Sequence, residues 1–410
     1  MARWPLNAAW RRGCRGAVDF QPFLHDRCWF AGEAGPCHGG RGVSQSPVAA
    51  GAGRDRGLWL VTVGMRTHTM SSGATFLAAL AAEVPASFWS MPALVACSGG
   101  ADSVALLVGL ARIAPADSAR RLVVVHAEHD LRAAAAADRE FVESLAGRLG
   151  LRCISCRLDT RVESGPPRGE GVEARARRLR YEFFAAAARE TGARHVAVAH
   201  TADDQAETIL QRMLRGTGLV GLGGMRAART LCDGVAVVRP LLRMPRADAR
   251  EFLAAVAQDW REDESNASTA PARNFLRHEV LPRCVAGPFP GAVAALERLG
   301  RQSGLVAAAL ASAAEHLLEA HATRQADGSI SVRASALTAL DAHLVAEIFA
   351  ALWRREGWPQ RDMTAAHYAR LAAVTVAIGR GDAQPGRGHD YPGGVRVMAG
   401  PGRTVLVRRG

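Results

Sequence analysis

Lysine is absent from this chain of 410 residues, and its 51 basic residues other than histidine are all arginine. A Walker A loop needs a lysine that reaches the β- and γ-phosphates, so this kind of nucleotide site is excluded. Catalysis through a lysine Schiff base or a lysyl adenylate is excluded too, because both use a lysine amine as the nucleophile. Any phosphate chemistry in this protein must therefore use other groups.

Cysteine is too sparse and too scattered for a disulfide-bonded scaffold of this length. The eight cysteines stand at positions 14, 28, 37, 97, 153, 156, 232 and 284. A reducing compartment suits this pattern, so we expect a cytoplasmic protein. Although 49% of the residues are hydrophobic, no apolar run is long enough to span a membrane, so we expect no transmembrane segment.

Acidic residues are fewer than basic ones, 39 against 51, which gives a formal charge of +12. A polyanion, with nucleic acid as the first candidate, is the partner that this charge suggests. The alternative explanation is compositional, because alanine, glycine and arginine are all abundant.

Three regions differ in pattern. Residues 1–68 are rich in glycine, arginine and proline without sustained periodicity, and we expect a disordered extension with no assigned function. Residues 69–285 show regular patterning, which predicts the larger folded domain. Residues 286–410 contain long alanine- and leucine-rich stretches, which predict a mainly helical, smaller domain.

The stretch ALVACSGGADSVALL at 93–107 is the most informative part of the chain. A short apolar run, a glycine turn and a second apolar run of helical character follow one another, as in a loop that binds phosphate at a helix N-terminus. Asp102 at the first helical turn can cap the helix or hold Mg²⁺. An ordinary strand-to-helix turn is the alternative. The predicted phosphate-binding residues are Ser98, Gly99, Gly100, Ala101, Asp102 and Ser103.

Strands alternate with helices of ten or more residues after this loop, which predicts an α/β fold with a doubly wound parallel sheet. Ligands of such sheets bind at the carboxyl ends of the strands. The expected strands after the first are Leu122–Val125, Leu151–Leu158, His195–Ala199 and Val235–Val238, and the expected helices are Ala133–Leu149, Val172–Thr191 and Asp203–Leu214.

Two polar clusters follow expected strands. His126 and Glu128 come directly after the second strand, where they could touch a nucleotide or, less expectedly, a metal. His200, Asp204 and Glu207 come after the fourth strand and precede or begin a helix. These groups could hold Mg²⁺, orient an incoming amine or take its proton. Acids near a helix N-terminus also stabilise the helix dipole, which is the structural alternative.

A third cluster, the glycine-rich segment at 215–224, contains five glycines in RGTGLVGLGG. We expect a flexible loop whose N–H groups accept a phosphate or a base. It lacks the strand-before, helix-after context of a dinucleotide-binding fingerprint, so that interpretation is rejected.

Several ordered blocks together resemble the tRNA(Ile)-lysidine synthetases, a family of PP-loop ATP pyrophosphatases. The blocks are SGGADS at 98–103, VHAEHDLR at 125–132, EARARRLRY at 173–181, AHTADDQAET at 199–208, RGTGLVGLGGM at 215–225, RPLL at 239–242, EDESN at 262–266 and RNFLRHEVLP at 273–282. The chain departs from the family pattern H-V-D-H-G-L-R at Ala127, Glu128 and Asp130.

The resemblance implies an α/β PP-loop domain and a two-step reaction. ATP adenylates O2 of the wobble cytosine in tRNA(Ile) with a CAU anticodon, pyrophosphate leaves, and the ε-amine of free L-lysine displaces AMP. It also implies that residues 69–285 form the ATP-binding catalytic domain, in which the loop binds ATP with Asp102 near Mg²⁺. Residues 286–410 would then contain a helical linker and a small domain that binds the tRNA.

We assign roles within that reaction from residue type and position. Asp204 and Glu207, with His200 nearby, are expected to position and deprotonate the lysine. Arg178 and Arg215 are expected to contact phosphate or tRNA, and His126 to contact substrate.

Two other functions stay open at this point. A PP-loop tRNA thiolase would use cysteine, and Cys153 and Cys156 have C-x-x-C spacing. Alternation along the strand at 151–158 turns these two side chains to opposite faces, which argues against a shared site. A non-catalytic nucleotide-binding module is the second alternative. The sequence leaves the oligomeric state open, with a homodimer as one option.

Overall fold

The structure, a computed structural model, describes residues 72–118, 121–129, 135–158, 172–262, 272–360, 362–382 and 388–409. The predicted N-terminal extension and Asp130 lie outside the described residues.

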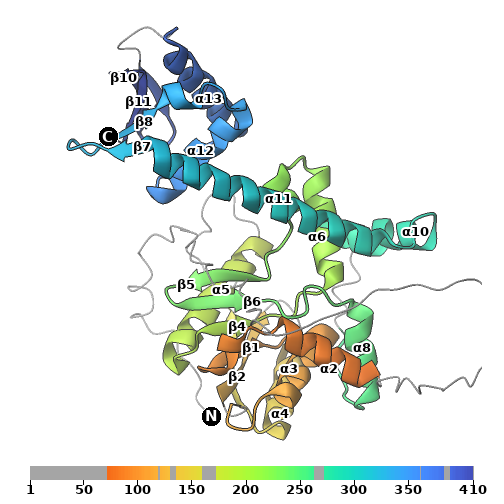
Figure 1. Ribbon diagram of the computed structural model, residues 1–410. Helices are drawn as coiled ribbons and strands as arrows, with labels where there is room; N and C mark the ends of the chain where they lie inside the picture. The colour runs from red at the N-terminus through yellow and green to blue at the C-terminus, as the bar shows by residue number, and fades with distance from the viewer. Residues whose placement is uncertain are drawn as a thin grey trace, which may run out of the picture. The chain divides into compact units, whose positions relative to one another are not determined.

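A six-stranded sheet forms the centre of the first part of the chain, with the order β3-β2-β1-β4-β6-β5 (Figure 1). All neighbouring pairs are parallel except β5 and β6. The strands are β1 (Ala93–Ala96), β2 (Leu122–His129), β3 (Arg152–Leu158), β4 (His195–Ala197), β5 (Ala228–Cys232) and β6 (Val235–Val238).

Helices cover both faces of this sheet. Their bounds are α2 (Ser72–Glu83), the 3-10 turn η1 (Ala86–Trp89), α3 (Ala101–Ile113), α4 (Ala135–Arg148), α5 (Val172–Thr191), α6 (Ala202–Leu214), α7 (Leu219–Leu222) and α8 (Arg246–Ala255). Residues of α2, α3, α4 and α8 share one core with one face of the sheet, and residues of α5 share a second core with the other face. The predicted doubly wound α/β fold is confirmed.

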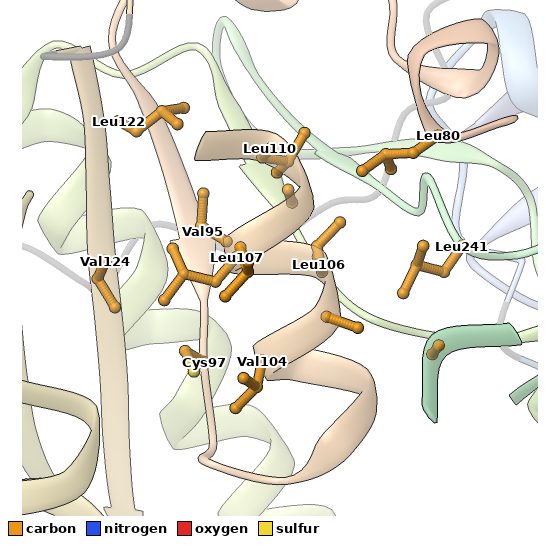
Figure 2. Packing of buried hydrophobic residues seen from close by; sticks show 14 of the residues in the cluster. Leu80, Val95, Cys97, Val104, Leu106, Leu107, Leu110, Leu122, Val124 and Leu241 are labelled. Atoms are coloured by element: carbon orange, nitrogen blue, oxygen red, sulfur yellow. The ribbon is translucent and has the colours of Figure 1, made fainter. Parts of the chain in front are cut away.

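Alternation along β1 explains the two cores. Leu94 packs on the α5 side, whereas Val95 and Cys97 pack on the α3 side. Figure 2 shows Val95 among leucines of α3, including Leu106, which is fully buried. Truncating such a leucine to alanine costs about 3 kcal/mol. The first strand and first helix are thereby held rigidly on either side of the loop that joins them.

The chain order places a switch point at β1. Its neighbours are β2 on one side and β4 on the other, with Val95 in register with Val124 and Ala197. Connections leave the sheet in opposite directions at this point, which is where doubly wound sheets bind ligands. The loop at 97–100 and the residues after β4 therefore lie side by side.

The rest of the chain begins with a helical connection. It consists of α9 (Ala272–Phe275), the π-helical turn η4 (Leu276–Val280), α10 (Leu281–Ala286) and the long helix α11 (Ala292–His321). Helix α11 packs on α6 and α7. Gly300 permits this approach, because any side chain at that position would collide with Ile209 of α6.

A five-stranded antiparallel sheet and two helices follow, with the strand order β7-β8-β11-β10-β9. The elements are β7 (Ala322–Arg324), β8 (Ile330–Arg333), the 3-10 turn η5 (Ala334–Leu337), α12 (Ala342–Arg355), α13 (Ala365–Arg380), β9 (Gly388–Tyr391), β10 (Val395–Gly400) and β11 (Thr404–Arg409). Trp353 is fully buried in the core of this unit. The helical stretches predicted for this region are confirmed. The sequence also indicated strands at Ser329–Val332 and Thr404–Val407, which correspond to β8 and β11, but not the other three strands.

Boundaries in the catalytic part agree closely with expectation for α5 and β6, which have the predicted limits. β2 is longer than expected and includes His126 and Glu128. β5, α2 and α8 were not predicted. No helix in the described ranges is long and apolar enough to cross a membrane.

Candidate active site

A pocket of about 790 Å³ opens at the carboxyl ends of β1, β2 and β4. It brings together Ser98 and Asp102 from the loop with His126, His200 and Asp204. Seven arginines also line it, namely Arg177, Arg180, Arg246, Arg250, Arg261, Arg273 and Arg277. The pocket thus combines groups that follow three separate strands with a strongly cationic wall.

The loop between β1 and α3 is closed on itself by hydrogen bonds. Ser98 N donates to Ser103 Oγ at 3.1 Å, and Ser103 Oγ donates to Gly100 O at 2.9 Å. Gly99 has φ of 96°, a left-handed conformation that favours glycine. Gly100 is the N-cap of α3 and makes no side-chain cap. The first N–H groups of α3 therefore stay available for an anion.

Asp102 does not cap α3. Its Oδ2 accepts a hydrogen bond from Arg246 Nε at 3.1 Å, while its Oδ1 is buried without a partner in the described structure. Burial raises the pKa of Asp102 although Arg246 opposes this effect. A cation would satisfy the orphaned oxygen. Mg²⁺ suits the site, since it typically uses one or two carboxylates together with water and substrate phosphates.

The N-terminus of α6 uses two of its acids structurally. Thr201 and Asp204 form a capping box, in which Thr201 N donates to Asp204 Oδ2 at 3.0 Å. Asp203 Oδ2 accepts from Arg246 N at 2.8 Å and so holds the first residue of α8. The alternative explanation, that acids near this helix N-terminus have a structural role, is therefore correct in part.

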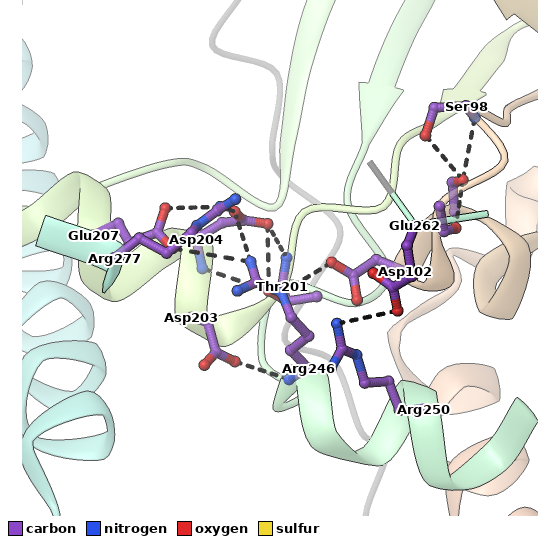
Figure 3. Close-up of polar contacts among 12 residues, drawn as sticks. Ser98, Asp102, Thr201, Asp203, Asp204, Glu207, Arg246, Arg250, Glu262 and Arg277 are labelled. Carbon is purple, nitrogen blue, oxygen red and sulfur yellow. Dashed lines mark hydrogen bonds and ion pairs between the residues drawn. The ribbon is translucent and has the colours of Figure 1, made fainter. Parts of the chain in front are cut away.

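The remaining oxygens belong to a carboxylate–arginine cluster, which we define as Asp204, Glu207, Arg246, Arg273 and Arg277 (Figure 3). Asp204 Oδ1 accepts from one nitrogen of each arginine, at 3.1, 3.0 and 2.7 Å respectively. Glu207 accepts from the Nε atoms of Arg273 and Arg277 at 2.8 and 2.6 Å. Glu207 is buried and does not line the pocket. It therefore acts on the pocket through Arg273 and Arg277, which it binds.

Electrostatics in the cluster favour the ionised form of Asp204. Burial tends to raise the pKa of Asp204, but Arg246 and Arg273 outweigh burial and lower it. The pKa of Arg246 is raised, because the charges of Asp204 and Asp102 exceed the cost of its burial. Asp204 therefore remains a carboxylate among the guanidinium groups of Arg246, Arg273 and Arg277.

His200 is half-buried in the pocket wall and stays neutral at pH 7. Burial lowers the pKa of its imidazole to about 4, although Asp204 partly opposes this effect. Its Nδ1 has no hydrogen-bond partner in the described structure. A neutral imidazole of this kind can orient a substrate group through a hydrogen bond, but it does not hold a second proton at neutral pH.

His126 also stays neutral, because burial lowers its pKa. Its Nδ1 lies 2.8 Å from the carbonyl of Cys97, which can only accept, so the proton sits on Nδ1. Because His126 lies within β2, this hydrogen bond joins β2 to the residue that directly follows β1. Its Nε2 is buried and has no partner in the described structure.

Two arginines of α5 line the pocket, but Arg178, which the sequence analysis selected, does not. Arg177 and Arg180 line the pocket, whereas Arg178 pairs with Glu182 at 3.0 Å on the helix surface. Tyr181 lies beside them, with Arg177 over its ring. Arg215 is an exposed C-cap residue of α6 and is not part of the pocket.

The glycine-rich segment is ordered rather than an open loop, contrary to expectation. Met225 N donates to Gln205 Oε1 at 2.7 Å, and Arg212 Nη1 donates to the carbonyls of Gly221 and Gly224. The short helix α7 in its middle packs on α11. Several of its N–H groups are thus used internally, and Gln205 anchors this segment rather than lining the pocket.

Cys153 and Cys156 do not form a shared site. Cys153 packs against the α3 side of the sheet and Cys156 against the α5 side. This confirms the expectation from strand alternation. Cys97 is buried behind the loop, and burial raises the pKa of its thiol, which makes it a packing residue rather than a nucleophile. Within the described ranges, no group of three or more metal-ligating side chains is suited to hold a metal.

Sequence reasoning did not identify the arginines of the cluster as site residues. Arg273 and Arg277 are four residues apart, a spacing that places two side chains on one helix face, and this signal was available in the RNFLR block. Arg246 gave no comparable signal, because it stands alone at the start of a helix that was not predicted.

Comparisons with known proteins bear on these features. Residues 76–284 match the PP-loop domain family. The chain is 33% identical to the tRNA(Ile)-lysidine synthase of Rhodopirellula baltica over 76% of its own length and 89% of that protein. It is 36% identical to the tRNA(Ile)-lysidine synthase of Salinispora tropica over 78% of its length and 91% of that protein.

A third relative is matched over a shorter range. The tRNA(Ile)-lysidine synthase of Deinococcus deserti is 43% identical over 51% of this chain, which spans 36% of that protein. The resemblance seen in the sequence is thereby confirmed. A PP-loop domain matched over half of the chain, together with two relatives aligned over most of both sequences, shows that this chain belongs to the tRNA(Ile)-lysidine synthase family of PP-loop enzymes.

Proposed function

We propose that this protein ligates free L-lysine to C2 of the wobble cytidine of tRNA(Ile) with a CAU anticodon, and converts ATP to AMP and pyrophosphate. The observation that carries the proposal is the placement of Asp102 of the PP-loop, His200 and Asp204 in one pocket. The names of the relatives supply the substrate, and the pocket offers a place for each reacting group.

The first step joins the wobble cytosine to AMP. O2 of the base attacks the α-phosphorus of ATP, the bond to the β-phosphate breaks, and pyrophosphate leaves. The N-terminus of α3 and the backbone of the loop stabilise the phosphate charge. Mg²⁺, held by Asp102 Oδ1, would neutralise further charge on the phosphates.

The second step replaces AMP with lysine. The ε-amine attacks C2, the bond between C2 and O2 breaks, and AMP carries O2 away. Asp204 supplies negative charge to hold the ε-ammonium close to the reacting base, and His200 offers a neutral acceptor. Both have pKa values far below that of an amine, so they position the ammonium while its protons pass on to solvent.

The other parts of the pocket suit the nucleic acid. Arg177 and Arg180 present positive charge on α5, where phosphates of an anticodon loop can bind. We still propose substrate contacts for Arg178, Arg215 and His126. The two arginines would make these contacts outside the pocket. We place the enzyme in the cytoplasm, where tRNA and free lysine are found.

The proposal is tested by AMP release from labelled ATP. Wild-type protein should release AMP only with tRNA that carries the CAU anticodon, and lysine should be required for repeated turnover. The matched control is the same tRNA with G in place of the wobble C. Equal AMP release with both tRNAs would overturn the proposal.

A further inference from the structure

The PP-loop supplies few positive charges for the anion that it is proposed to bind. The hydroxyl of Ser103 is committed to the loop itself, since it donates to Gly100 O and accepts from Ser98 N. A triphosphate or a free pyrophosphate carries several negative charges, and backbone N–H groups with a helix dipole offset only part of them. Because the chain contains no lysine, the side-chain cations at the phosphates must be arginines.

Five of the seven pocket arginines are engaged elsewhere. Arg246, Arg273 and Arg277 are held by Asp204 in the carboxylate–arginine cluster. Arg177 lies over the ring of Tyr181 on α5, and Arg180 of the same helix also interacts with Tyr181. Arg250 and Arg261 remain.

Arg261 lies directly against the loop. Its backbone N donates to Gly99 O at 2.9 Å, and its side chain packs against Gly99. The guanidinium Nε is 3.2 Å from Asp138 Oδ1, and the side chain is 45% exposed. A guanidinium that is anchored at its base and open at its tip can turn towards an anion in the loop.

Arg250 approaches the loop from α8. It stands one helical turn after Arg246, whose guanidinium contacts Asp102. Its only ion pair in the described structure is a loose one, with Nη2 3.9 Å from Glu262 Oε1, and the side chain is 52% exposed. Figure 3 shows Arg250 and Glu262 close to Asp102.

From this geometry we propose that Arg250 and Arg261 bind the β- and γ-phosphates of the nucleotide and then the leaving pyrophosphate. The proposal rests on the proposed function, because it assumes a pyrophosphate-releasing loop. Glu262 and Asp138 hold the two guanidinium groups at the edge of the pocket until phosphates, which carry more charge, replace these carboxylates as partners.

The test is calorimetric titration of the full chain with inorganic pyrophosphate in the presence of Mg²⁺, and separately with AMP. Arg250→Ala and Arg261→Ala should each weaken pyrophosphate binding about five- to twentyfold, as expected for a charge-assisted contact at a half-exposed site. AMP binding should not change, because AMP lacks the β- and γ-phosphates. Arg243→Ala is the matched control, since Arg243 is an exposed arginine paired with Glu83 and lies outside the pocket.

Glu262→Gln gives a change of opposite sign. Removing the carboxylate that holds Arg250 should tighten pyrophosphate binding, whereas a merely structural role of this pair would weaken it. The proposal is overturned if wild-type protein does not bind pyrophosphate, if the two alanine variants bind it like wild type, or if they lose AMP and pyrophosphate affinity equally. A wild-type chain that binds pyrophosphate but incorporates no lysine would instead contradict the proposed function alone.

Discussion

The pair formed by Glu207 and Arg277 offers the sharpest test of the carboxylate–arginine cluster. The perturbations are Glu207→Ala, Arg277→Ala and the double variant. Glu207 is 1% exposed and Arg277 is 21% exposed, and two hydrogen bonds, of 2.6 and 3.0 Å, join them. Each side chain therefore depends on the other for much of its charge compensation.

The expected loss of unfolding free energy depends on which ion-pair partners remain after each substitution. Breaking a fully buried ion pair costs about 3 to 5 kcal/mol. Glu207→Ala leaves Arg277 bound to Asp204, and Arg277→Ala leaves Glu207 bound to Arg273. We therefore expect each single change to lower the free energy of unfolding by about 2 kcal/mol, and the coupling between them to be about 1.5 kcal/mol.

Urea denaturation at pH 7 measures this cycle, with the double variant losing less stability than the sum of the single variants. Arg283→Ala is a suitable control, because Arg283 pairs with Glu279 at the surface and its removal should cost less than 1 kcal/mol. Additive effects of Glu207→Ala and Arg277→Ala, within about 0.3 kcal/mol, would refute the description of the cluster as a connected unit.

Three further predictions concern the pocket. The folded state lowers the pKa of His200 to about 4 from the 6.5 of a free imidazole, so the unfolded state binds more protons between these two pH values and stability falls as the pH drops through them. His200→Gln should remove about 2 kcal/mol of the loss between pH 7 and 5, as measured by urea denaturation at both pH values. Asp102→Asn should reduce tRNA-dependent AMP release on the order of 100-fold while the protein stays folded, and normal release would exclude its role. Gln205→Ala should lower the free energy of unfolding by about 1 to 3 kcal/mol by leaving Met225 N without its acceptor, and an unchanged stability would contradict that anchoring role.

Local patterns were sufficient for much of the fold. The helix at Val172–Thr191 ends before a glycine, and the strand at Val235–Val238 is a short β-branched run, so periodicity located both. β2 was predicted too short, because His126 and Glu128 are polar residues in a strand whose end reaches the pocket. β5 was missed because its residues are half exposed or exposed and show no apolar run.

The candidate site was only partly predictable, for a related reason. Asp102, His200 and Asp204 follow buried strands, and chain order alone placed them at one edge of the sheet. Which cations hold the acids depends on contacts between residues 42 to 144 positions apart. Such tertiary pairs leave no trace in local composition, so Arg246 had no signal of its own.

The account's central claim is that the pocket joins lysine to the wobble cytidine. The most direct measurement is the mass of the nucleoside at that position after the purified chain has acted on tRNA(Ile) with a CAU anticodon, ATP and isotope-labelled lysine. The account predicts a cytidine heavier by one lysine less one water, with the label retained, and far less of this product from Asp102→Asn in the same reaction time. An unmodified cytidine, or one that has gained sulfur instead, would contradict it.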